Sequence, residues 1–162
     1  MDASLLTAKC TLVPAHFFSP GRAEELLSEV VTLRGGETVR HMEVPQYDAV
    51  LIYAEENVSG EPSGVPPEMF FILRDLPSLP EYNKILASWT EGWLYLAIAQ
   101  GGSLLLCNVY EAPDFTTAQY YLFLAMKSLQ LNPEVSTVCW RRSIGPEEEL
   151  SLYRYFKSVE QL

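Results

Sequence analysis

WLYLAIA at residues 93–99 and LLLCNVY at residues 104–110 are two apolar runs separated only by Gln100-Gly101-Gly102-Ser103. Both runs are rich in the aliphatic and aromatic side chains that β-strands favour. Because glycine accepts the positive φ of a tight turn, the QGGS segment predicts an antiparallel hairpin. Both runs are apolar at consecutive positions, so we expect both faces of each strand to be covered and the hairpin to lie inside a sheet.

The residues after this hairpin predict two helices separated by a strand. Asp114 is a favourable N-cap for a helix that runs to about Gln130. That helix is apolar on most sides, so we expect it to be buried on most sides. Residues 135–140 predict a strand, and Gly145-Pro146 opens a last helix that extends through Val159.

The residues before the hairpin predict one helix and five strands. The helix begins at Ser19-Pro20 and ends at Gly35-Gly36, and a loop rich in Gly, Pro, Ser and Glu covers residues 56–67. The strands are expected at residues 10–13, 39–44, 48–54, 69–73 and 85–89. The resulting order, β-α-β-β-β-β-β-β-α-β-α, predicts an α/β fold with a mixed sheet flanked by helices.

Length and composition favour a single compact domain over residues 1–162, with 48% hydrophobic residues to form its core. The net charge is −10, and an acidic surface repels nucleic acid and anionic membranes at long range, so neither is an expected partner. The three cysteines are far apart, and we expect neither a signal peptide nor a membrane-spanning segment. We therefore expect a cytoplasmic protein.

Residues that could perform chemistry do not form a recognisable pattern. The nucleotide-binding and hydrolase motifs GxxxxGK[ST], GxGxxG and GxSxG are absent. His16 near Cys10 could be a base beside a nucleophile, but no third residue orients the pair, so a surface-loop histidine is the preferred interpretation. We interpret His41 as a solvent-facing strand residue. No catalytic residue is therefore predicted.

Acidic residues also give no metal site. Glu147, Glu148 and Glu149 point in different directions on a helix, so they cannot converge on one ion, and they complement the helix dipole instead. Glu55 and Glu56 end a strand, but no partner for catalysis is identifiable. No metal or other cofactor is expected.

An aromatic contact patch is the alternative that points to a protein partner or to self-association. The patch would contain Tyr153 and any tryptophan that does not reach the core, among Trp89, Trp93 and Trp140. Packing in the core is, however, the more common role of each of these aromatic residues.

Several short blocks resemble an uncharacterised bacterial family, domain of unknown function 3822. They are Leu12-Val13-Pro14 with Phe17-Phe18, Tyr47 to Val50, Gly102 to Asn108 followed by Asp114 and Tyr120-Tyr121, and Leu152 to Phe156. That family is grouped with the actin-like ATPase superfamily. The resemblance thus implies a reduced actin-like ATPase (ribonuclease H-like) fold, shortened at its N-terminus.

The phosphate-binding residues that this superfamily uses are only partly present. A second phosphate hairpin reading close to DxGGGT would correspond to Ala99–Ser103, where the turn glycines remain but the metal-organising aspartate does not. The adenosine segment would fall near Ser143-Ile144-Gly145, with one glycine only. ATP is therefore possible as a ligand but not expected.

Three hypotheses follow for the function. The first is a non-catalytic protein-interaction or scaffold domain on a degenerate actin-like ATPase fold. The second is a degenerate nucleotide-binding protein in which Gly101, Gly102, Ser103 and Gly145 contact a phosphate. The third is a small hydrolase whose residues converge only in space.

Overall fold

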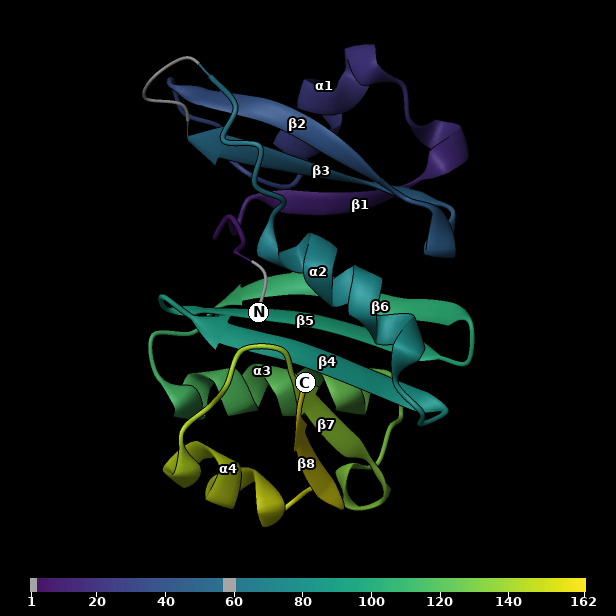
Figure 1. The fold of residues 1–162 in the computed structure, drawn as a ribbon, viewed down its shortest axis with the longest axis vertical. Helices are drawn as coiled ribbons and strands as arrows, with labels where there is room; N and C mark the ends of the chain where they lie inside the picture. The colour runs from purple at the N-terminus through teal and green to yellow at the C-terminus, as the bar shows by residue number, and fades with distance from the viewer. Residues whose placement is uncertain (1–2, 57–60) are drawn as a thin grey trace. The chain divides into compact units, whose positions relative to one another are not determined.

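A computed structural model describes residues 3–56 and 61–162 (Figure 1), so residues 57–60 of the predicted 56–67 loop lie outside the described residues. The chain divides into two compact units, Met1–Arg74 and Asp75–Leu162, and each is described by itself.

The first unit is built on a three-stranded antiparallel sheet with the order β1-β3-β2. Its strands are β1 (Cys10–Pro14), β2 (Glu37–Val44) and β3 (Ala49–Glu56), which confirms the three strands predicted in this region. The central position of β3 explains its apolar run, which is buried from Ala49 to Glu55. Helix α1 (Ala23–Ser28) packs Leu27 against Val50 and Ile52 on one face of this sheet.

The first predicted helix is shorter than expected. A 3-10 turn at Pro20–Arg22 precedes α1, and α1 ends at Ser28 instead of reaching Gly35-Gly36. Val30, Val31 and Thr32 follow after the C-cap residue Glu29. Their β-branched side chains lose χ1 freedom in a helix, which favours an early end.

The strand predicted at residues 69–73 is wrong, because this segment lies in helix α2 (Glu68–Asp75). A five-residue apolar run does not distinguish a strand from a buried helix by its periodicity. The flanking residues carried the missed signal: Pro66-Pro67 precedes the run, and Glu68 places a carboxylate in the first helical turn.

The second unit contains a mixed five-stranded sheet with the order β6-β5-β4-β7-β8. Strands β4 (Asn83–Thr90), β5 (Trp93–Gln100) and β6 (Ser103–Glu111) are antiparallel neighbours. Strands β7 (Thr137–Trp140) and β8 (Ser158–Gln161) run parallel to β4. Helices α3 (Phe115–Ser128) and α4 (Pro146–Tyr153) lie on one face of this sheet (Figure 1), where Leu122 and Leu152 join one core. The predicted mixed sheet flanked by helices is confirmed.

The hairpin at residues 93–110 is also confirmed, but its two strands differ in burial. β5 is buried from Leu94 to Ala99, as expected for an inner strand. β6 was predicted to be covered on both faces, and this is wrong: it is the edge strand and exposes Ser103, Leu105, Asn108 and Glu111. Its register with β5 shifts between Ile98 and Ala99, which interrupts the regular alternation of the two faces.

Helix α3 begins as predicted, because the Asp114 carboxylate accepts a hydrogen bond of 2.7 Å from the backbone N–H of Thr117. The expectation that α3 is buried on most sides is wrong, since Tyr120 is 60% exposed and Leu124 is 47% exposed. These two residues are one turn apart and form a separate face of the helix.

The last predicted helix ends early. α4 stops at Tyr153, and Val159 lies in β8, which pairs in parallel with β7. The four residues Ser-Val-Glu-Gln carry no strong local strand pattern. Their conformation follows from pairing with β7, a partner about 20 residues earlier in the chain.

Candidate functional site

The predicted glycine turn is a tight hairpin loop between β5 and β6. Gly101 has φ +54°, and its N–H donates a hydrogen bond of 2.9 Å to the carbonyl oxygen of Tyr82. Beside it the Gln100 amide donates a 2.9 Å hydrogen bond to Asn83 Oδ1. The structure therefore brings Gly101, Gly102 and Ser103 together at the tip of one hairpin.

Gly145 lies on the connection from β7 to α4, outside the β5–β6 hairpin. Gln100 pairs with Asn83 at the start of β4, whereas β7 ends with Trp140 opposite Ala87. Asn83 and Ala87 are four residues apart in β4, which corresponds to about 13 Å along the strand. The connection from β7 to α4 therefore leaves the sheet at a distance from the glycine turn. Gly145 is the N-cap of α4, and the structure does not bring it to Gly101–Ser103.

The two histidines are surface residues that pack on phenylalanine rings. The ring centroids of His16 and Phe17 are 4.4 Å apart, and those of His41 and Phe18 are 4.7 Å apart. Desolvation raises the pKa of Cys10 to about 12, so its thiol is protonated at neutral pH and is a poor nucleophile. The same holds for Cys139, whose pKa burial raises to about 12.

Glu55 has a structural environment. Its carboxylate accepts hydrogen bonds from Arg40 Nε at 2.7 Å and from the Ser63 N–H at 2.9 Å. The pKa of Glu55 is lowered, first by a side-chain hydrogen bond from Ser63 and also by the Arg40 charge. Glu55 is therefore the ionised half of a nearly buried ion pair within the β2–β3 sheet. Within residues 3–56 and 61–162, no group of three or more His, Cys, Asp or Glu side chains is arranged to hold a metal ion.

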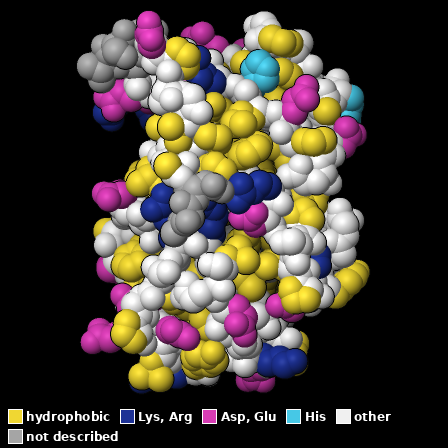
Figure 2. Space-filling view, in the orientation of Figure 1, with side chains coloured by type: hydrophobic (Ala, Val, Ile, Leu, Met, Phe, Trp, Pro, Cys, Tyr) yellow, Lys and Arg dark blue, Asp and Glu magenta, His cyan; other side chains and the backbone are white. Residues whose placement is uncertain are grey.

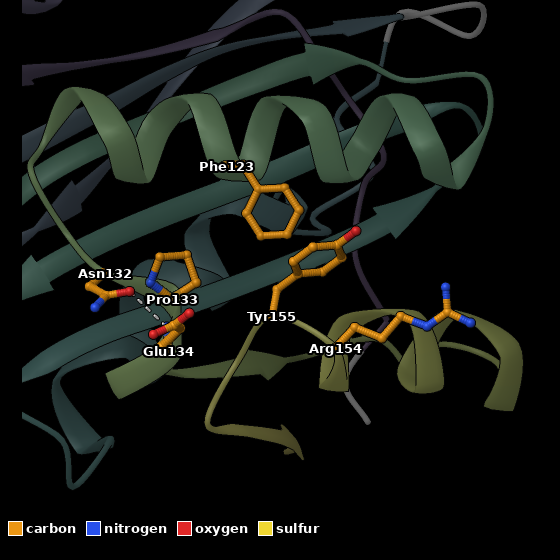
Figure 3. A pocket seen from close by; sticks show the side chains of 6 residues that line it. All are labelled: Phe123, Asn132, Pro133, Glu134, Arg154 and Tyr155. Carbon is orange, nitrogen blue, oxygen red and sulfur yellow. Dashed lines mark hydrogen bonds between the residues drawn. The ribbon is translucent and has the colours of Figure 1, made fainter.

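A pocket of about 400 Å³ opens beside the C-terminal half of α3 (Figure 3). Its wall is largely formed by rings: Phe123 points from α3 toward Tyr155, and Pro133 lies across from them. The ring centroids of Phe123 and Tyr155 are 5.0 Å apart in an edge-on arrangement. Asn132, Glu134 and Arg154 complete the lining. A concave, mainly apolar pocket of this volume falls in the range of ligand and side-chain binding pockets.

Local hydrogen bonds hold the segments around this pocket. Asn132 Oδ1 accepts a 3.0 Å hydrogen bond from the N–H of Glu134 and starts the 3-10 turn Pro133–Val135. The N–H of Lys157 donates to the carbonyl oxygen of Pro133 at 3.2 Å, which joins this turn to the segment after α4. The Ser151 hydroxyl donates to Gln119 Oε1 at 3.1 Å and connects α4 to α3. The pocket is therefore formed by fixed elements.

Large hydrophobic side chains are exposed on the same elements that form the pocket. We call them, together with the pocket, the α3–α4 face; they are Tyr120, Leu124, Val135, Leu150, Tyr153 and Tyr155. Figure 2 shows hydrophobic side chains between acidic ones over α4. An exposed apolar surface of this kind on a folded protein is typical of an interaction site.

Sequence reasoning identified only one member of this face. Tyr153 is 47% exposed as the patch hypothesis required, but Trp140 is 1% exposed and belongs to the core. Trp89 is partly buried and donates a 2.9 Å hydrogen bond from Nε1 to the Ala112 carbonyl. The missed signal was the Tyr120 and Leu124 pair, which lies one turn apart and outside the core stripe of α3.

Residues 70–159, more than half of the chain, match a family described as a protein of unknown function, DUF3822. The chain belongs to the DUF3822 family. The matched region covers most of the second unit, including α3, α4 and the glycine turn. The family resemblance read from the short sequence blocks is therefore confirmed.

The fold of this DUF3822 protein matches a crystal structure from Bacteroides thetaiotaomicron, a protein with an actin-like ATPase fold and unknown function. The two share 20% sequence identity with a TM-score of 0.79 over 97% of this chain. The DUF3822 chain covers 66% of that protein, slightly less than two thirds of its length. The expected actin-like ATPase fold is confirmed.

These relatives indicate no specific function. The family and the Bacteroides protein are both described as being of unknown function, and a search of curated proteins found no match. In the part of the chain that the structure describes, every helix is too short or too polar to cross a bilayer.

Proposed function

We propose that this DUF3822 protein is a non-catalytic interaction domain that binds a protein partner through the α3–α4 face. One observation carries the proposal: the elements that form a ring-lined pocket also expose tyrosine and aliphatic side chains, and Tyr155 belongs to both groups. Tyrosine is enriched among the residues that dominate binding energy at protein interfaces. A pocket beside such residues accepts an apolar side chain of a partner.

The geometry of the face supports binding of a protein. Leu124 and Leu150 keep 47% and 65% of their surface in contact with solvent. Covering apolar surface contributes about 25 cal/mol per Å², so each side chain stabilises a complex when a partner covers it. Tyr155 is packed on Phe123 before binding, so ordering its ring costs little conformational entropy.

We also propose a cytoplasmic location in a bacterium, with the acidic charge keeping the protein away from nucleic acid and anionic lipid. The net charge of −10 and the three widely spaced cysteines support this proposal.

We further propose that residues 1–162 fold as one domain. A unit as small as Met1–Arg74 buries only about 60% of its unfolded surface, and units of that size are marginal alone. One cooperative transition in circular dichroism and tryptophan fluorescence is expected, and separate transitions would contradict the single domain.

Site-specific photo-crosslinking in native lysate tests the interaction function. A photoreactive amino acid at Leu124 or Leu150 is expected to give cross-linked proteins that mass spectrometry identifies. Val30, 61% exposed at the end of α1, is the matched control position outside the face. If cross-links at Leu124 and Leu150 do not exceed those at Val30, the face is not an interaction surface.

A degenerate nucleotide-binding role is the second candidate. The exposed backbone at Gly102 and Ser103 supports it, because turn N–H groups can face an anion, whereas the Gly101 N–H already donates to the Tyr82 carbonyl oxygen. Stabilisation by ATP and magnesium in a thermal-shift assay, lost in Gly102→Val, would favour this role. No shift at millimolar ATP would remove it.

A further inference from the structure

Two unlike charges border the apolar pocket of the α3–α4 face. Glu134 belongs to the 3-10 turn after α3, and Arg154 caps the C-terminal end of α4. Both side chains are exposed, and in the described part of the chain neither takes part in an ion pair. In Figure 3 Arg154 extends away from the rings, and Glu134 lies on the opposite side of the pocket beside Pro133.

A surface that carries both charges beside one apolar pocket can be complementary to itself. In a two-fold symmetric dimer, each residue pair across the interface occurs twice, with the roles of the two copies exchanged. Glu134 of one copy can therefore meet Arg154 of the second copy while the reverse pair forms at the same time. Tyr155 lines the same pocket as the two charges, so pairing the charges also brings this ring to the interface.

We infer that the α3–α4 face binds a second copy of this chain, with reciprocal Glu134–Arg154 pairs on either side of the pocket. The inference rests on the proposed function, since it names the partner of the same face. The apolar side chains provide the affinity, and the charge pairs determine the orientation, because exposed ion pairs contribute little net energy.

The distribution of charge allows a second copy to bind at this face. Residues 1–74 carry eleven acidic and five basic side chains, whereas residues 75–162 carry ten and six. Much of the acidic excess therefore lies outside the unit that bears the face. At physiological salt, charges more than about 8 Å apart are largely screened, so the net charge does not prevent two copies from meeting at this face.

Charge reversal and complementation test the inference. Sedimentation velocity from about 1 to 200 µM should show a concentration-dependent dimer of the wild-type chain. Glu134→Arg and Arg154→Glu should each weaken the dimer at least tenfold, because each places two pairs of like charges in contact. An equimolar mixture of the two variants should recover the dimer, since every reversed charge then faces an unlike charge.

Glu29→Arg is the matched control. Glu29 is exposed at the end of α1, and its reversal changes the net charge as much as Glu134→Arg does. It should leave the dimer unchanged. A monomer at every concentration, a dimer that neither reversal weakens, or a mixture that does not recover would each overturn the inference. In all three cases cross-links from Leu124 or Leu150 to a different protein would still support the proposed interaction function.

Discussion

Alanine at the two adjacent turn glycines should have opposite effects on stability. Gly101 has φ +54°, in the left-handed region, whereas Gly102 does not have a positive φ. The left-handed conformation costs an L-residue with a Cβ roughly 1–2 kcal/mol. A Cβ at Gly101 would also lie 3.3 Å from Cε1 of Tyr82, whose side chain is 70% exposed and free to shift. Gly101→Ala should therefore destabilise the protein by about 1–2 kcal/mol, mainly through φ.

Gly102→Ala should be neutral or slightly stabilising. No heavy atom lies within 4 Å of a Cβ built at Gly102. At a position whose backbone alanine accepts, the substitution stabilises by about 0.4–1 kcal/mol, because it restricts the unfolded chain. The two variants should thus differ by about 1.5–3 kcal/mol, although each adds the same methyl group.

Urea unfolding followed by tryptophan fluorescence measures this difference. All three tryptophans lie in the unit that contains the turn, so the signal reports on the relevant structure. With an m-value of about 1–3 kcal/mol per M, the midpoints should differ by about 1 M. Gly101→Asn should retain more stability than Gly101→Ala, since asparagine tolerates the left-handed conformation. Equal midpoints for the two alanine variants, or recovery of Gly101→Ala by Tyr82→Ala, would refute the argument from φ.

Three further predictions concern the core, an ion pair and a thiol. Leu122→Ala, at a position with 0% exposure, should lower the free energy of unfolding in urea by about 2–5 kcal/mol. A decrease below about 1 kcal/mol would show that the surrounding side chains relax into the cavity. The lowered pKa of Glu55 means that its contribution to stability is present above the ordinary glutamate pKa and is lost as pH falls through the folded pKa. Glu55→Gln should therefore flatten the pH dependence of the urea midpoint below about pH 4.5. An unchanged slope would contradict the stabilisation of the carboxylate by Ser63 and Arg40. Cys139, 4% exposed and with a pKa raised to about 12, should not react with a thiol reagent at pH 8 until the protein unfolds, and rapid labelling of the native protein would contradict its burial.

Much of the fold was predictable because the decisive signals are local. Glycines between two apolar runs identify the β5–β6 hairpin, and Asp114 marks the start of α3 through a hydrogen bond three residues away. The family was recognisable for the same reason, since its sequence blocks lie within single elements. The candidate site was less predictable: only Tyr153 was named, because exposure of an aromatic residue depends on what covers it.

The sequence by itself determined the position of the β5–β6 turn, the start of α3 and the acidic composition. These properties depend on backbone φ, hydrogen bonds between near neighbours, and composition. Tertiary structure alone decided that β6 is an edge strand, that residues 158–161 pair with β7, and that Phe123, Pro133 and Tyr155 surround one pocket. Each of these outcomes is a contact between segments distant along the chain, and its free energy comes from a partner that no local pattern specifies.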